Sequence, residues 1–257
     1  RVGIVMQLDR LVAPICGALA LSAGFALVPA SPPGQGSIRA AAAVTERAFV
    51  PARPDGVTAR AVAAARDLLE ALEDTQRAAA VFERDDAVQR TRWSNLPSGI
   101  FERRGLRMQD LGEPLRRKVL ALLGVVLSEP GLQQVLDNMF ADGQLPAPPP
   151  ERGVTFGEHE FFLAFIGAPS LVEPWMIQFG GHHLGLNITV LGERIVLAPC
   201  LTGGQPMHFR QGERDVVQMA EELDLAYGLL ESQDEAQRAR AVRADVHIDL
   251  TWGPGRE

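Results

Sequence analysis

Residues 179–187 read Phe-Gly-Gly-His-His-Leu-Gly-Leu-Asn, and an apolar run with interspersed polar residues follows to Leu191. This alternation predicts a β-strand after the glycines, because successive side chains of a strand point to opposite faces. His182 then shares a face with the leucines, and His183 shares a face with Asn187. Paired glycines inside a strand indicate a bulge or a close approach of another backbone. Without a bulge, the two adjacent histidines cannot bind one ion from one face.

The segments on either side of this stretch also have the composition of strands. Gly192-Glu193 is a tight two-residue connection and predicts a hairpin, whereas Gly203-Gly204 and Pro206 end the run. The predicted strands are residues 161–166, 175–179, 184–191 and 194–199.

Helical periodicity precedes these strands and returns after them. Apolar residues at helical spacing predict helices at residues 59–84, 113–127 and 130–141. Residues 213–242 are rich in Glu, Gln, Ala and Arg, and they predict a long final helix. The order of elements predicts an α+β fold, with N-terminal helices packed on an antiparallel sheet meander and followed by a long C-terminal helix.

The beginning of the chain has the features of a secretory signal. Arg10 supplies a positive charge, residues 11–28 are apolar and uncharged, and Val28-Pro29-Ala30 offers small side chains to a signal peptidase. A secreted or periplasmic protein is therefore expected, in contact with a membrane only through this signal. The alternative is an uncleaved anchor, since the apolar segment approaches the spanning length. The expected organisation is a signal peptide at 1–30, a linker at 31–57 and a single α+β domain at 58–257.

Composition narrows the class of protein. The chain has 257 residues, 46% of them hydrophobic, and a net charge of −7. A folded core is expected, and binding to nucleic acid is disfavoured because an acidic surface repels phosphates. The abundance of Ala, Arg and Gly indicates a bacterial source. The two cysteines are Cys16, inside the signal, and Cys200, so we expect no intramolecular disulfide and interpret Cys200 as a small buried side chain.

The histidine pair is the strongest candidate for chemistry. Imidazole acts as a general base or binds a divalent transition metal. His183 is the predicted catalytic residue and, with His182, a predicted metal ligand; the alternative for both is a structural histidine. Glu158-His159-Glu160 places carboxylates beside an imidazole, so Glu158 and His159 are further predicted metal ligands. The alternative there is a solvent-exposed entrance to a strand.

Aromatic and amide side chains offer a second kind of site. Trp175 and Asn187 are predicted to contact a small-molecule ligand, and Trp93 is a further candidate for lining a pocket; the alternative is that the aromatic residues belong to the core. Two functions follow from these candidates. One is an exported metal-dependent enzyme or redox protein with a site around the Gly-Gly-His-His motif, and the other is a non-catalytic exported protein that binds a small ligand and has structural histidines.

Several blocks of this sequence resemble the DUF3500 family of uncharacterised proteins. The resemblance covers about residues 90–240, and members of that family are often exported. It implies no reaction, and the Glu158-His159-Glu160 cluster is not part of the family pattern. Family chains continue beyond the point where this sequence stops, which implies a truncated domain. The matching blocks are Trp93–Pro97, Arg104–Leu106, Leu127–Gly131, Phe165–Ser170, Trp175–Asn187, Pro199 and Gly203–Pro206.

Overall fold

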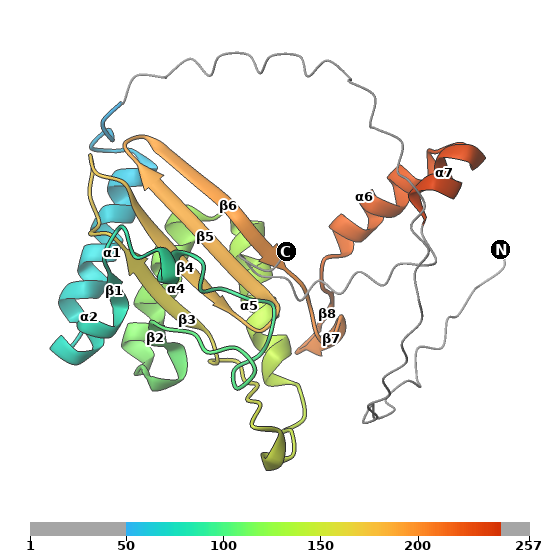
Figure 1. The fold of residues 1–257 in the computed structure, drawn as a ribbon, viewed down its shortest axis with the longest axis horizontal. Helices are drawn as coiled ribbons and strands as arrows, with labels where there is room; N and C mark the ends of the chain where they lie inside the picture. Colours follow the sequence, from blue (N-terminus) through green and yellow to red (C-terminus); the bar gives the residue numbers. More distant parts are fainter. Residues whose placement is uncertain (1–49, 243–257) are drawn as a thin grey trace, which may run out of the picture. The chain divides into compact units, whose positions relative to one another are not determined.

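The computed structural model describes residues 50–242 of the chain (Figure 1). The predicted signal peptide at 1–30 and most of the predicted linker at 31–57 lie outside the described residues. Among residues 50–242, no helix is both long enough and apolar enough to cross a membrane.

The N-terminal half of the described chain is helical, as the periodicity predicts. The helices are α1 (Val57–Ala71), α2 (Asp74–Ala80), α3 (Ala87–Arg90), α4 (Glu113–Val126) and α5 (Glu129–Gly143), with 3-10 turns at Met108–Asp110 and Pro150–Arg152.

The single helix expected over 59–84 is instead two helices and a short strand. Leu72 is buried in extended conformation and ends α1, and a capping box between Glu73 and Gln76 begins α2. The helical pattern continues through this break, so apolar spacing alone does not reveal it.

A six-stranded sheet has the order β1-β3-β4-β5-β6, with β2 also paired to β3; β1 and β2 come from between the helices, and the other four strands follow them. Every pairing is antiparallel except β1 with β3, which confirms an α+β fold with a mostly antiparallel sheet. Leu191 pairs with Arg194, as the predicted two-residue hairpin requires. The strands are β1 (Val81–Phe82), β2 (Leu106–Arg107), β3 (Phe162–Ile166), β4 (Trp175–Gly181), β5 (Leu184–Leu191) and β6 (Arg194–Thr202).

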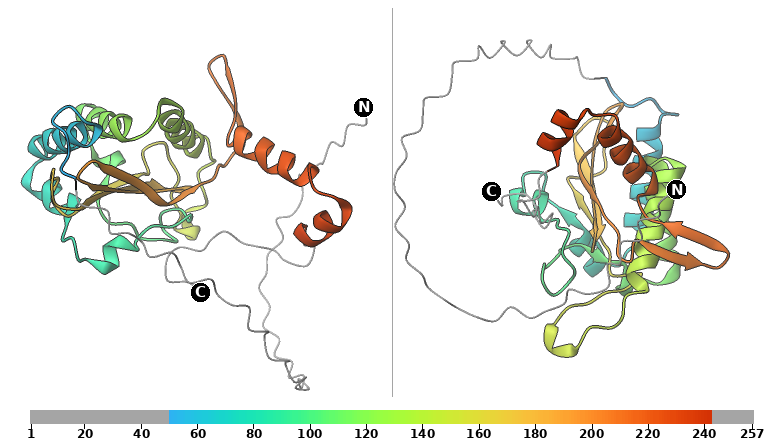
Figure 2. Two further views of the ribbon diagram at one scale, coloured as in Figure 1. Left: turned by 90° about the horizontal axis from the view of Figure 1, so that it is seen from above. Right: turned by 90° about the vertical axis from the view of Figure 1, so that its right-hand side faces the viewer.

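The two faces of the sheet have different coverings. Phe165, Ile177 and Leu186 point to the face that α1, α4 and α5 cover, where they join the main hydrophobic core. The opposite face carries Gln178 and Asn187 and lies under the segment that contains α3, which Figure 2 shows on the far side of the sheet from the helices. The alternation in the sequence therefore separates a dry face from one with buried polar groups.

The C-terminal region differs from the predicted long helix at 213–242, which is wrong. Phe209 and Val216 pack on Ala141 of α5 and so favour a hairpin, with Gly212 in left-handed conformation at its turn. A capping box of Asp234 and Gln237 begins a separate last helix. The elements are β7 (His208–Gln211), β8 (Arg214–Val217), α6 (Ala220–Glu231) and α7 (Glu235–Ala241).

Strand β6 pairs on one side with β5, and much of it is exposed. Val196 and Leu197 are 51% and 42% exposed. Cys200 is also exposed, which corrects its interpretation as a buried side chain, because β6 lies at the edge of the sheet rather than in its centre.

Candidate functional site

The Gly-Gly-His-His motif forms the turn between β4 and β5. Gly181 pairs with Leu184, so His182 and His183 are the two turn residues, and His183 has a φ of 60°. A Cβ on Gly180 would lie 2.5 Å from the carbonyl oxygen of Leu184, and a Cβ on Gly181 would lie 2.6 Å from the Phe161 ring. The glycines therefore allow other atoms to approach the backbone closely, which is one of the two roles predicted for paired glycines in a strand.

His182 is held by a buried carboxylate. Its Nδ1 lies 2.7 Å from Oδ1 of Asp142 on α5, and the two side chains are 7% and 3% exposed. The other oxygen of Asp142 accepts a hydrogen bond from the Gly157 backbone N–H. Among residues 50–242, Nε2 of His182 has no hydrogen-bond partner. A carboxylate on Nδ1 fixes the proton there and leaves Nε2 as the basic nitrogen.

Sequence reasoning did not identify Asp142. One signal was present, because an acidic residue in the last turn of a helix is unfavourable beside the negative end of the helix dipole and indicates a compensating partner.

His183 is held by Asn95 and by the loop that follows β6. Its Nδ1 lies 2.8 Å from Oδ1 of Asn95, and its Nε2 lies 3.2 Å from Oε1 of Gln205. Its backbone N–H donates to Asn95, and its carbonyl accepts from Gly203. The two imidazole rings are in contact, with their centroids 3.8 Å apart and their planes tilted by 31°.

The electrostatic setting of His183 favours the neutral imidazole. Burial and, secondly, the adjacent His182 lower the pKa of His183, while Gln205 and Asp142 oppose the shift. A neutral His183 with its proton on Nδ1 donates to Oδ1 of Asn95, and its unprotonated Nε2 accepts from Gln205 when that amide is turned by 180° to present its nitrogen.

Arg103 links the hairpin, through hydrogen bonds, to the segment that contains α3. One guanidinium nitrogen, Nη2, donates to the carbonyls of Ser94, Leu96 and Gly181 at 2.6–2.7 Å. Burial lowers the pKa of Arg103 to about 10, against the opposing effect of Glu160 and Asp142. The side chain remains a cation near pH 7, in a setting where a charge needs partners.

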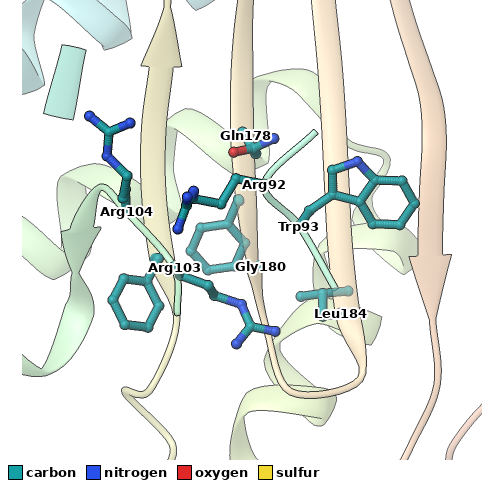
Figure 3. A pocket seen from close by; sticks show the side chains of 9 residues that line it. Arg92, Trp93, Arg103, Arg104, Gln178, Gly180 and Leu184 are labelled. Atoms are coloured by element: carbon teal, nitrogen blue, oxygen red, sulfur yellow. The ribbon is translucent and has the colours of Figure 1, made fainter. Parts of the chain in front are cut away.

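A narrow pocket lies beside this hairpin, between the segment that contains α3 and the strands β3, β4 and β5 (Figure 3). It encloses about 270 Å³, open solvent included, of which about 10 Å³ is available to the centre of a water molecule. Arg92 and Arg103, which line it, each have one buried guanidinium nitrogen without a hydrogen-bond partner among the described residues: Nε of Arg92 and Nη1 of Arg103. The lining residues are Arg92, Trp93, Arg103, Arg104, Phe162, Gln178, Phe179, Gly180 and Leu184.

The predicted ligand contacts Trp175 and Asn187 occupy opposite faces of the sheet. Trp175 is 1% exposed, belongs to the helix-side core and donates from Nε1 to the Ser170 carbonyl. Asn187 bridges Gln178 and the carbonyl of Pro199. They therefore do not share one binding surface, whereas Trp93 does line the pocket beside the hairpin.

The predicted metal ligands fall into two places. His182 and His183 lie in contact at the hairpin, whereas Glu158 and His159 line a separate cleft beside α4 and α5. Within residues 50–242, no three His, Cys, Asp or Glu side chains gather as a set of metal ligands.

The family model described as "Protein of unknown function (DUF3500)" matches residues 55–256 of the chain. Comparison with curated proteins and comparison with solved structures gave no match.

Proposed function

We propose that this chain, which belongs to the DUF3500 family, is an exported protein that binds a small oxyanion in the arginine-lined pocket beside the histidine hairpin. The observation that supports this function is the pair of buried guanidinium nitrogens without partners, Nε of Arg92 and Nη1 of Arg103. A buried charged donor that lacks an acceptor costs on the order of 1–3 kcal/mol or more. A ligand oxygen that accepts from either nitrogen removes part of this cost, and charge-assisted hydrogen bonds are the strong ones.

The shape of the pocket favours a compact ligand. The space open to the centre of a water molecule is about 10 Å³, which is room for about one water, so the lining side chains move apart when a carboxylate or phosphate group enters and a bulkier molecule is disfavoured. Phe162, Phe179 and Leu184 provide apolar walls that exclude water and strengthen the interaction with the arginines. In this function the histidines are structural: they hold the hairpin between Asp142 and Asn95.

The test measures thermal unfolding while acetate, phosphate or sulfate replaces chloride at constant ionic strength. One of these anions should stabilise the protein in a saturable way, by about 2.7 kcal/mol at a concentration of 100 times Kd. Arg92→Gln should weaken this effect at least tenfold. Arg90→Gln, an exposed arginine on the same segment that does not line the pocket, is the matched control. Equal stabilisation of the Arg92→Gln variant and the wild type would count against the proposal.

The metal-dependent enzyme or redox protein is the second candidate, and the Asp142–His182 pair favours it. Histidines that bind metals commonly donate their other ring N–H to a carboxylate, which is the arrangement around His182 Nδ1. Nε2 of His182, with His183 beside it, would hold the ion, and the ion would supply Lewis-acid or redox chemistry. Stoichiometric metal in fresh protein that is lost in His183→Ala supports this function. Metal-free protein whose heat stability is unchanged by Zn²⁺ or Cu²⁺ counts against it.

Export is part of both candidates and has its own test. Its support is the signal-like segment at 1–30. A mature N-terminus near Ser31 supports cleavage, and an intact segment 11–28 in the purified protein contradicts it.

A further inference from the structure

Strand β6 lies at the edge of the sheet and presents backbone groups on its outer side (Figure 1). Leu191 and Arg194 flank a two-residue turn and are paired, so they exchange backbone hydrogen bonds between β5 and β6. Because hydrogen bonding alternates along a strand, Val196 also faces β5, whereas Ile195 and Leu197 direct their N–H and C=O groups away from it. These four groups form a template for another strand.

The part of this edge that is open for pairing is short. Pro199 has no N–H, so a ladder of hydrogen bonds on the outer side ends before it. At the other end, the N–H of Glu193 donates to the carbonyl of Val50. A further strand therefore pairs with residues 194–198.

The side chains beside this edge belong to the core face but are incompletely covered. Ile195 pairs with Val190 and Leu197 pairs with Ile188, so both point to the face of the main hydrophobic core. Leu197 is nevertheless 42% exposed. The occupant that fits is a strand whose apolar residues all point to the core face, because it would extend this core past Leu197.

The chain contains such a segment after α7. Residues 246–252 read Val-His-Ile-Asp-Leu-Thr-Trp, so apolar and polar side chains alternate strictly. This period of two is typical of a strand with one buried face. The segment lies outside the described residues, and the match to the family model includes it.

The segment follows a pair of helices that begins beside the end of β6. Asn138 of α5 donates to the carbonyl of Gly203, just after β6, and Gln134, one turn earlier on α5, donates to Glu222 in the first turn of α6. Helix α7 turns back toward α6, because residues of both helices line one hollow. The 12 residues of α6 extend about 18 Å. Residues 243–252 span about 33 Å when extended, which is enough to return to β6.

We propose that residues 246–252 add to the outer edge of β6 as a further strand, with their four apolar side chains on the face of the main core. This strand pairs with the backbone of Ile195 and Leu197 and covers the Leu197 side chain. The proposal is independent of the oxyanion pocket, because no residue of β6 lines that pocket.

The test is amide hydrogen exchange in the full chain, measured for individual residues by NMR. The amides of Ile195 and Leu197 should exchange at least tenfold more slowly than unprotected amides. The amide of Val196, which faces β5, is the internal reference for a protected group. Unprotected exchange at Ile195 and Leu197, with Val196 protected, overturns the proposal.

A substitution in the segment identifies the occupant. Ile248→Asp places a charge on its apolar face and should speed exchange at Ile195 and Leu197 at least tenfold. Continued protection of Val196 shows that the sheet stays folded. His247→Asp, on the opposite face, is the matched control and should leave exchange unchanged. Persistent protection of Ile195 and Leu197 in Ile248→Asp overturns the proposal, and protection that rises with protein concentration would assign the edge to a second copy of the chain.

Discussion

Gly181→Ala should destabilise the protein, because the added methyl group has no room. Its carbon would lie 2.6 Å and 2.7 Å from two atoms of the Phe161 ring and 2.8 Å from the carbonyl oxygen of Glu160. The ring must retreat by about 0.8 Å to reach ordinary contact at 3.4 Å. Phe161 is fully buried and stacks on Phe179, so this movement disturbs the core.

Over-packing of this kind costs roughly 1–3 kcal/mol. At about 2 kcal/mol, Tm should fall by roughly 4–8 °C for a domain of this size. The assay is urea unfolding followed by tryptophan fluorescence, with a thermal scan as the second measurement.

Gly228→Ala in α6 is the matched control for Gly181→Ala. Nothing lies within 4 Å of the position of its added carbon, so the substitution should stabilise the helix by up to about 1 kcal/mol. If Gly181→Ala unfolds within about 0.5 kcal/mol of the wild type, the close approach at the hairpin does not limit stability and the reasoning fails.

Three further outcomes are expected. Asp142→Asn replaces the charged partner of His182 and should lower the free energy of unfolding by about 1.5–3 kcal/mol, and an unchanged urea midpoint would refute this. The pKa of His183 is lowered in the folded state, so the free energy of unfolding should be highest above about pH 6.5 and should fall as His183 becomes protonated at lower pH. His183→Asn should remove this part of the dependence of the unfolding free energy on pH, and an unchanged dependence would contradict the assignment. Cys200 should be labelled by a thiol reagent in native protein, as peptide mapping of the labelled residue would show, whereas labelling of Cys200 only after unfolding would be inconsistent with its exposure.

Local patterns predict the sheet well, because alternation is a property of the strand itself. Residues 184–191 form a strand with the predicted bounds, and Leu184 and Leu186 share one face as predicted, which packs in the main hydrophobic core. The break after Leu72 was missed, since the capping box of α2 lies inside a continuous helical pattern. The hairpin of β7 and β8 was also missed, because Val216 packs with Phe209 on α5, a contact that helical spacing does not reveal.

The histidine motif was identified from sequence, but its partners were not. Asp142 and Asn95 lie 40 and 88 residues from the histidines that they contact, and no local pattern links them. Arg103 donates to Gly181 from 78 residues away. Partners of this kind depend on how the layers come together, which a single sequence does not specify.

The chain of amides on the sheet has a consequence for folding. Gln89 donates to Gln178, Gln178 donates to Asn187, and Asn187 donates to the carbonyl of Pro199, all at 2.9 Å. A slip of β5 by one residue would turn Asn187 toward the dry side of the sheet and leave both neighbours without partners. The amide chain therefore favours the native register: a shifted sheet leaves polar groups unpaired on three strands at once, so it is less stable and should separate again before the remaining contacts form.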